Sequence, residues 1–149
     1  MDFELTEEQK MLKWMVHDFA EKEVRPQAAE WEAKAEYPST EYLKKLVELG
    51  LIGITLPERY GGQGQTALEA ILAIEELARI TPLAAWPVFE SSVGPVRVIE
   101  QFGTEELKQK YLPPVPRGEM WIVAVIQTQG SDGNKRLRYM VPRETPRGS

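Results

Sequence analysis

Apolar residues recur at helical spacing along most of the chain. The box Thr6-Glu7-Glu8-Gln9 marks the first helix, because a Thr hydroxyl and a Gln three residues later satisfy two free backbone N–H groups. Pro26 cannot lie in an undisturbed helix interior, so we expect a kink or a second helix there, and Pro38 ends helical structure at about Tyr37. The apolar face of this first stretch comprises Leu12, Met15, Val16, Phe19, Ala20 and Val24.

A second helix begins at Ser39 or Thr40, which are both N-cap residue types. Gly50 fits the position just after its end, where glycine adopts the left-handed conformation most readily. Its buried face comprises Leu43, Leu46, Val47 and Leu49.

The third helix, residues 67–80, is apolar around most of its circumference and follows a second capping box, Thr66-Ala67-Leu68-Glu69. A helix of this kind is surrounded by others, so we expect it at the centre of a bundle. Glu75 and Glu76 are adjacent and therefore do not face each other across the helix. This arrangement favours a solvated polar stripe, with Arg79 paired to one of them, over acid–base chemistry.

A fourth helix is predicted from Pro87 to Phe102, with a kink at Pro95, and a fifth opens at residues 104–106. The pattern then changes at residues 121–126, a β-branched apolar run that is the only convincing strand. The predicted fold is therefore an all-α helical bundle with one C-terminal β-strand segment.

Composition narrows the possible functions. The chain has 149 residues, the size of one domain, and its net charge of −5 argues against a nucleic-acid partner. It has no cysteine and a single histidine, His17, which excludes disulfides, thiolate metal sites and multi-histidine metal sites. We interpret His17 as a histidine at the core boundary. No signal peptide and no membrane-spanning run is visible, so a cytoplasmic location without a membrane partner is expected.

Charge is distributed unevenly between the body and the end of the chain. Residues 134–149 carry a net charge of +4, which leaves −9 on the residues before them. Pro142, Pro146 and Gly148 interrupt any period in this segment, so we expect a basic, disordered tail. A nucleic-acid-binding patch is the less favoured alternative, because only Tyr139 interleaves an aromatic ring.

Two segments resemble the acyl-CoA dehydrogenase family. The first is Leu-Gly-Leu-Ile-Gly-Ile-Thr-Leu-Pro-Glu-Arg-Tyr-Gly-Gly at residues 49–62, and the second is Phe-Gly-Thr-Glu-Glu with Tyr-Leu-Pro-Pro at residues 102–114, followed by Gly118-Glu119. The first segment lacks the Gly-Lys-Ser/Thr of a phosphate-binding loop, so we interpret it as a helix-to-helix turn.

This resemblance implies a helical N-terminal domain over residues 1–119 and the start of a flavin β-domain at residues 120–133. It also implies FAD-dependent α,β-dehydrogenation of acyl-CoA thioesters in fatty acid metabolism, with electrons passed to an electron-transfer flavoprotein. By position, Ile126, Gln127 and Thr128 would contact the flavin and Ser131 the CoA. A polar turn after a strand is an equally favoured interpretation of these residues.

The resemblance further places Trp86, Phe89 and Val93 beside the acyl-chain cavity. Bulky side chains there would favour short or branched acyl groups. Ordinary packing in the bundle core is the more favoured interpretation of the same three residues.

Two functional hypotheses follow. In the first, the chain is the N-terminal domain, or a truncated form, of such a flavoprotein, and it is inactive alone because no residue matches the family's catalytic base. In the second, it is a non-catalytic helical assembly module that self-associates as a homo-oligomer or pairs with a full-length relative, because lost domains would leave apolar surface uncovered.

Overall fold

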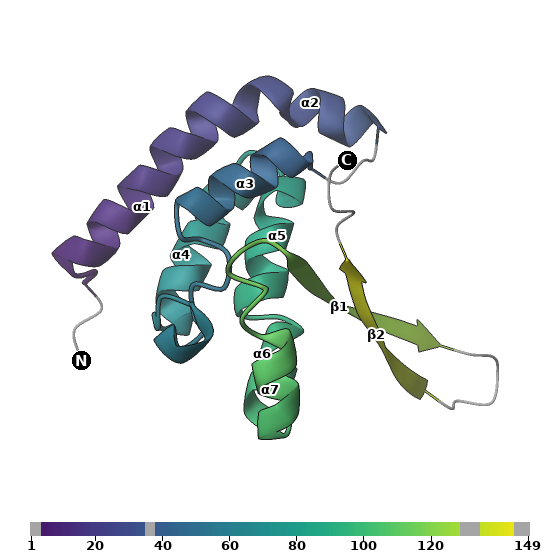
Figure 1. Cartoon of the computed structure of the whole chain (residues 1–149). Coiled ribbons are helices and arrows are strands. Elements are labelled where there is room, and N and C mark those ends of the chain that lie inside the picture. Colours follow the sequence, from purple (N-terminus) through teal and green to yellow (C-terminus); the bar gives the residue numbers. More distant parts are fainter. Residues whose placement is uncertain (1–3, 35–37, 129–134, 145–149) are drawn as a thin grey trace.

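The computed structural model describes residues 4–34, 38–128 and 135–144, and it confirms the all-α class (Figure 1). Helices account for most of the described chain, and the two strands come last. In order, the elements are α1 (Glu7–Phe19), a π-helical turn (Ala20–Val24), α2 (Arg25–Lys34), α3 (Thr40–Glu48), a 3-10 turn (Glu58–Tyr60), α4 (Ala67–Ala78), α5 (Pro82–Ser92), α6 (Val96–Phe102), α7 (Glu105–Tyr111), β1 (Met120–Thr128) and β2 (Lys135–Glu144).

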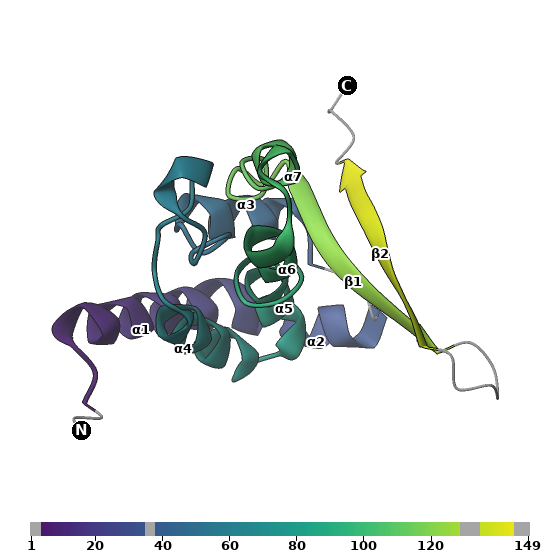
Figure 2. The same cartoon turned by 90° about the horizontal axis from the view of Figure 1, so that it is seen from below.

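Helix α4 packs between α1 and α5, as expected for the central helix. Its buried face includes Ala70, Ala73 and Leu77, none of which is exposed to solvent. The expectation of an apolar surface covered all round is wrong on one side, because Leu68 and Ile71 are exposed. Figures 1 and 2 show α1 and α2 as one long arc across the bundle, with the β1–β2 hairpin at the other end of the molecule from the start of α1.

The junction between α1 and α2 shows how the chain accommodates Pro26, where we expected a kink or a second helix. Here the Arg25 N–H donates to the carbonyl of Ala20, five residues back, which is a π-helical hydrogen bond. Pro26 then falls in the first turn of α2, where a missing N–H costs nothing. Ala20 and Val24, at the two ends of this turn, are both fully buried.

Helix α3 ends in the expected glycine stop. Ser39 is its N-cap, and its hydroxyl accepts a hydrogen bond from the Tyr42 N–H. At the other end Gly50 has a φ of 70°, and the Leu51 N–H donates to the Leu46 carbonyl over 3.0 Å. This is a Schellman motif, which turns Leu51 inward, where it is fully buried.

The glycine-rich loop that follows is a turn between helices, as predicted. Gly61 and Gly64 have φ values of 84° and 63°, which side-chain-bearing residues rarely adopt. Gly62 is needed for a different reason, because a Cβ there would lie 2.1 Å from the Leu56 carbonyl oxygen. Tyr60 is almost fully buried, and its hydroxyl donates to Glu105 over 3.1 Å, which joins the loop to α7.

The predicted fourth helix is corrected. It begins at Pro82, not Pro87, because Thr81 is a buried N-cap and Pro82 occupies the first helical position. Pro87 lies inside α5. The helix stops before Gly94, which tolerates the close approach of the Phe89 carbonyl oxygen, 3.0 Å from a Cβ built there, and α6 starts afresh after Pro95.

The expected disordered tail is corrected for residues 135–144, which form β2 and pair antiparallel with β1. The register runs from Met120 opposite Glu144 to Thr128 opposite Lys135. Val141 and Pro142 face the single residue Ile122 in a β-bulge, which is a place where a strand tolerates the missing N–H of proline. Pro142, which argued against a strand in the sequence, is therefore accommodated in β2 by this bulge.

A network of ion pairs joins α1 to α4. His17 Nδ1 lies 2.8 Å from Glu76, confirming a histidine at the core boundary, while Lys13 and the Arg79 Nε lie 3.5 and 3.4 Å from the same carboxylate. Glu76 is only 5% exposed, so it does not belong to a solvated stripe as predicted. Its three cationic or hydrogen-bonding neighbours explain how a carboxylate is tolerated there.

This network lowers the pKa values of two carboxyls, those of Glu76 and Glu21. Burial raises the pKa of Glu76, but the hydrogen bond from His17 and the charge of Lys13 outweigh burial and hold it below the ordinary 4.5. Hydrogen bonds from Arg25 and Arg79 lower the pKa of Glu21 to about 2. Among the described residues, no helix is long and apolar enough to cross a membrane.

We expect Gly62→Ala to lower the free energy of unfolding by about 2–4 kcal/mol, because backbone atoms must move to admit the methyl group. Gly64→Ala is the matched control. A Cβ there meets only Glu58, at 3.8 Å, so the cost is the left-handed conformation alone, about 1 kcal/mol. Urea denaturation of both variants measures the difference, and equal losses would contradict this account of Gly62.

We expect the fold to lose stability as the pH falls through the range from about 4.5 to about 2. Both carboxyls have pKa values lowered by folding, so the unfolded chain binds more protons in that range and is favoured there. Glu76→Gln should lower the free energy of unfolding at pH 7 by about 1–2 kcal/mol and flatten the acid limb.

The control for this experiment is Glu75→Gln. Glu75 is 61% exposed at its side chain and, among the described residues, forms an ion pair only with Lys13, so its loss should cost under about 1 kcal/mol. Denaturant midpoints across the pH range would reveal both effects. An unchanged acid limb in Glu76→Gln would show that the buried carboxylate contributes nothing to the pH dependence.

Candidate functional site

The sequence predicts Trp86 and Phe89, on α5, and Val93, just after its end, as residues beside the acyl chain, and the structure places them in two different environments. Trp86 and Phe89 are 49% and 40% exposed, and their ring centroids lie 5.5 Å apart. Val93 is partly buried and packs against the core. Ordinary core packing therefore describes Val93, while Trp86 and Phe89 form an aromatic pair at the surface.

The opposite face of α5 is fixed by hydrogen bonds to the inner turn, which we define as residues 51–56, between α3 and the glycine-rich loop. The Ser91 hydroxyl accepts from the Gly53 N–H over 3.1 Å and donates to the Pro87 carbonyl over 2.7 Å. The Thr55 hydroxyl donates to the Ser92 carbonyl. These contacts hold α5 in one orientation, and so they position the aromatic pair.

Helix α3 also holds α5. The Tyr42 hydroxyl donates to the Ala84 carbonyl over 2.9 Å, and burial raises the pKa of this tyrosine. Neither Tyr42 nor Ser91 is predicted from the sequence as a positioning residue. The one available signal for the latter was the Ser91-Ser92 pair within an otherwise apolar helical stretch.

Polar groups are also buried along α5. Glu90 and Ser92 are 7% and 0% exposed, and the Ser92 hydroxyl has no hydrogen-bond partner in the described part of the chain. No group of three or more His, Cys, Asp or Glu side chains among the described residues is arranged to hold a metal ion. The described α5 face therefore offers an apolar surface over a hydrogen-bonded support.

The expected flavin-contacting residues lie on another element. Ile126, Gln127 and Thr128 form the end of β1, with backbone positions opposite Leu137, Arg136 and Lys135 of β2. The first part of β1 contacts α5, since Trp121 and Ile122 pack against the core, but Figures 1 and 2 show the hairpin projecting beyond the helices. Ser131 lies outside the described residues.

The comparison with protein families gives a match over most of the chain. Residues 6–119 match the family model described as "Acyl-CoA dehydrogenase, N-terminal domain". Among curated relatives, the short-chain-specific acyl-CoA dehydrogenase of Clostridium acetobutylicum is 40% identical over 119 residues, which are 80% of this chain and 31% of the relative.

Solved structures agree in fold. A chain in the structure of the electron transferring flavoprotein of Acidaminococcus fermentans superposes with a TM-score of 0.77 and 38% identity, covering 89% of this chain and 34% of that one. A glutaryl-coenzyme A dehydrogenase in complex with glutaryl-CoA gives a TM-score of 0.77 with 31% identity over the same shares. This chain therefore spans about a third of the length of the proteins it matches.

Proposed function

This chain belongs to the acyl-CoA dehydrogenase family, and we propose that it provides the helical wall beside the acyl group in an FAD-dependent acyl-CoA dehydrogenase. The observation that carries the proposal is the aromatic pair Trp86–Phe89, which is exposed on one face of α5 while the other face is anchored. These two large rings are exposed at the surface of the domain and supply an apolar surface suited to a hydrocarbon chain.

The rigidity of α5 supports this role. Dehydrogenation requires the substrate to be held between a base and the flavin in a site that excludes water. A wall anchored through Ser91 and Tyr42 keeps the two rings in place without a change in the backbone. The bulk of these rings limits the depth available to an acyl group, which favours short or branched substrates.

The flavin would lie against β1. Along β1, the described part of the chain supplies a partner strand on one edge only, so the backbone groups of the other edge remain available to a ring system. Ile126, Gln127 and Thr128 would contact the flavin, and Ser131 the CoA. When bound, FAD accepts the hydride that leaves the β-carbon of the substrate.

In this proposal the catalytic base and the remaining walls come from parts of the active protein outside residues 6–119. The structural likeness to a chain in an electron transferring flavoprotein structure supports a flavoprotein of that kind as the electron acceptor. The working protein would then act on acyl-CoA thioesters in fatty acid metabolism, in the cytoplasm.

The test replaces the corresponding segment of the Clostridium acetobutylicum relative with residues 6–119 of this chain. We expect the purified chimera to show the visible absorption of FAD and to reduce a dye when given butyryl-CoA. Trp86→Ala and Phe89→Ala in the chimera should raise kcat/KM for longer acyl-CoA relative to butyryl-CoA by about 10-fold, because two or three methylenes gain room.

Phe102→Ala is the matched control, since Phe102 is also a large exposed ring, 81% exposed, but lies on α6. It should leave the chain-length preference unchanged. A folded, yellow chimera whose preference ignores both α5 rings would overturn the assignment of this wall.

The second hypothesis, a helical assembly module, is favoured by a different observation. Large apolar side chains are exposed on several helices of the described chain, among them Trp14 and Phe102. Light scattering of the isolated chain measures its oligomeric state, and so tests whether it self-associates. A homo-oligomer that persists in high salt would support the module, and a monomer at all concentrations would exclude self-association.

A further inference from the structure

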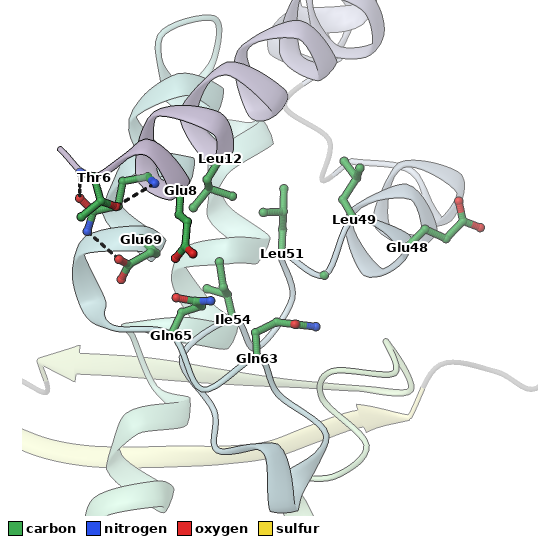
Figure 3. A pocket seen from close by; sticks show the side chains of 12 residues that line it. Thr6, Glu8, Leu12, Glu48, Leu49, Leu51, Ile54, Gln63, Gln65 and Glu69 are labelled. Atoms are coloured by element: carbon green, nitrogen blue, oxygen red, sulfur yellow. Dashed lines mark hydrogen bonds between the residues drawn. The ribbon is translucent and has the colours of Figure 1, made fainter.

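Helices α1 and α4 are joined at two ends by different chemistry. At their first turns, which Figure 3 shows beside a pocket, the Gln9 amide donates to Glu69 over 2.8 Å. Hydrogen bonds from Thr66 and Gln9 lower the pKa of the Glu69 carboxyl, so Glu69 stays ionised from pH 8 to pH 5. The other end is built around His17, and histidine is the side-chain type whose charge ordinarily changes in that range.

One ring nitrogen at that end has two neighbours with opposite requirements. His17 Nδ1 lies 2.8 Å from Glu76 Oε2 and 3.2 Å from Arg79 Nη2. An ionised carboxylate only accepts hydrogen bonds and a guanidinium only donates them, whereas Nδ1 of a neutral imidazole carries either a hydrogen or a lone pair. Glu76 and Arg79 therefore cannot both form a hydrogen bond with His17 Nδ1 at the same time.

The surroundings favour Glu76 as the partner of the ring. Its side chain is only 7% exposed, and a buried carboxylate needs donors. Burial raises the pKa of Glu76, but the hydrogen bond from His17 and the charge of Lys13 hold it below the ordinary 4.5, so the group is an anion at neutral pH. We therefore expect neutral His17 to carry its hydrogen on Nδ1 and to leave Nε2 without one.

Arg79 has a second partner within reach. Its Nη2 also donates to Glu21 Oε1 over 2.5 Å, while its Nε lies 3.4 Å from Glu76. Hydrogen bonds from Arg25 and Arg79 lower the pKa of Glu21 to about 2, so Glu21 is ionised over the same pH range. The Arg79 guanidinium thus lies between two carboxylates, and it can lose contact with one while it keeps the other.

His17 is the only histidine in the chain, so a change of charge in this network between pH 8 and pH 5 begins at its ring. The other charged side chains of the network and its neighbours form ion pairs of their own. These pairs, on α1, the π-helical turn, α2, α3 and α4, are Lys13 with Glu75 and Glu76, Lys22 with Asp18, Arg25 with Glu21, and Lys45 with Glu23.

We propose that His17 is a pH-dependent switch that exchanges the cation beside Glu76, a device independent of the acyl-CoA function proposed above. With His17 neutral, Arg79 and Lys13 supply the positive charge next to the buried carboxylate. With His17 protonated, the ring supplies it through a charge-assisted bond from Nδ1–H, and repulsion between the ring and Arg79 displaces the guanidinium toward Glu21.

The position of Arg79 in the fold gives this exchange its place of action. Arg79 is the C-cap residue of α4 and lies two residues before Thr81, the N-cap of α5. The switch therefore acts where α1 meets the junction of two further helices. The contact between the first turns of α1 and α4 lies at the far end of the same helix pair.

The test uses NMR spectra of the whole chain labelled with nitrogen-15 and carbon-13. Because the chain has one histidine, its ring nitrogens give the only imidazole signals. At pH 8 we expect the chemical shifts of a hydrogen-bearing Nδ1 and a bare Nε2. A ring that carries its hydrogen mainly on Nε2 would overturn the assignment of Glu76 as its partner.

A second measurement follows Arg79 as the pH is lowered from 8 to 5. The Nε and Cζ signals of Arg79 should shift along the same curve as the His17 ring, because the protonated ring displaces the guanidinium. Arg97 is the matched control, since it is also paired with a glutamate, Glu100, at 3.1 Å, but lies on α6 outside this network. Its signals should not follow the ring. Arg79 signals that stay constant while the ring titrates would overturn the switch.

Variants identify the group that drives the exchange. His17→Gln keeps a side chain that can donate to Glu76 but gains no charge, so the pH-dependent shift of Arg79 should be lost. Glu75→Gln removes a neighbouring carboxylate that pairs with Lys13, and it should leave both measurements unchanged. A persistent Arg79 shift in His17→Gln would overturn the role of the ring. Since the first two measurements use the unaltered chain, they decide the question even where a variant fails to fold.

Discussion

The fold depends on burying a short non-helical segment inside a bundle. Leu51, Ile52, Ile54 and Leu56 are all almost fully buried, yet the backbone between them is not helical, so its polar groups need partners from elsewhere. Helix α5 supplies some of them through Ser91, and the glycine loop supplies others through hydrogen bonds to Ile54 and Leu56. The close contact between Gly62 and Leu56 follows from the same requirement.

This constraint also explains why the surface of α5 is organised as it is. On the side that meets residues 51–56, the Ser91 hydroxyl accepts the buried Gly53 N–H, and the Ser92 carbonyl accepts the Thr55 hydroxyl. The aromatic residues Trp86 and Phe89 lie on the other side, where they are 49% and 40% exposed. The packing of α5 against residues 51–56 thus has two consequences. It anchors one face of the helix by hydrogen bonds, and it leaves the two aromatic rings exposed on the other face.

Much of this was predictable from the sequence, because local signals dominate helix ends. Both capping boxes and the Gly50 stop follow from residue types within one turn, and the central position of α4 follows from the apolar residues around its circumference. The start of α5 was missed because Thr81-Pro82 both closes one helix and opens the next, and a local pattern cannot rank the two roles. Strand β2 was missed because Pro142 reads as a breaker until the bulge opposite Ile122 is known. The burial of Glu76 depends on α1, sixty residues away, so no pattern within α4 reveals it.

The hydrogen bond between Gln9 and Glu69 links the first turns of two helices that are distant in sequence. Helix ends normally fray independently and exchange their amide protons fastest. Here the two side chains that cap α1 and α4 are bonded to each other, so loosening of one end removes a partner from the other. Amide hydrogens in these two first turns should therefore exchange as one cooperative unit, which makes the start of the protein a reporter on the stability of its central helix.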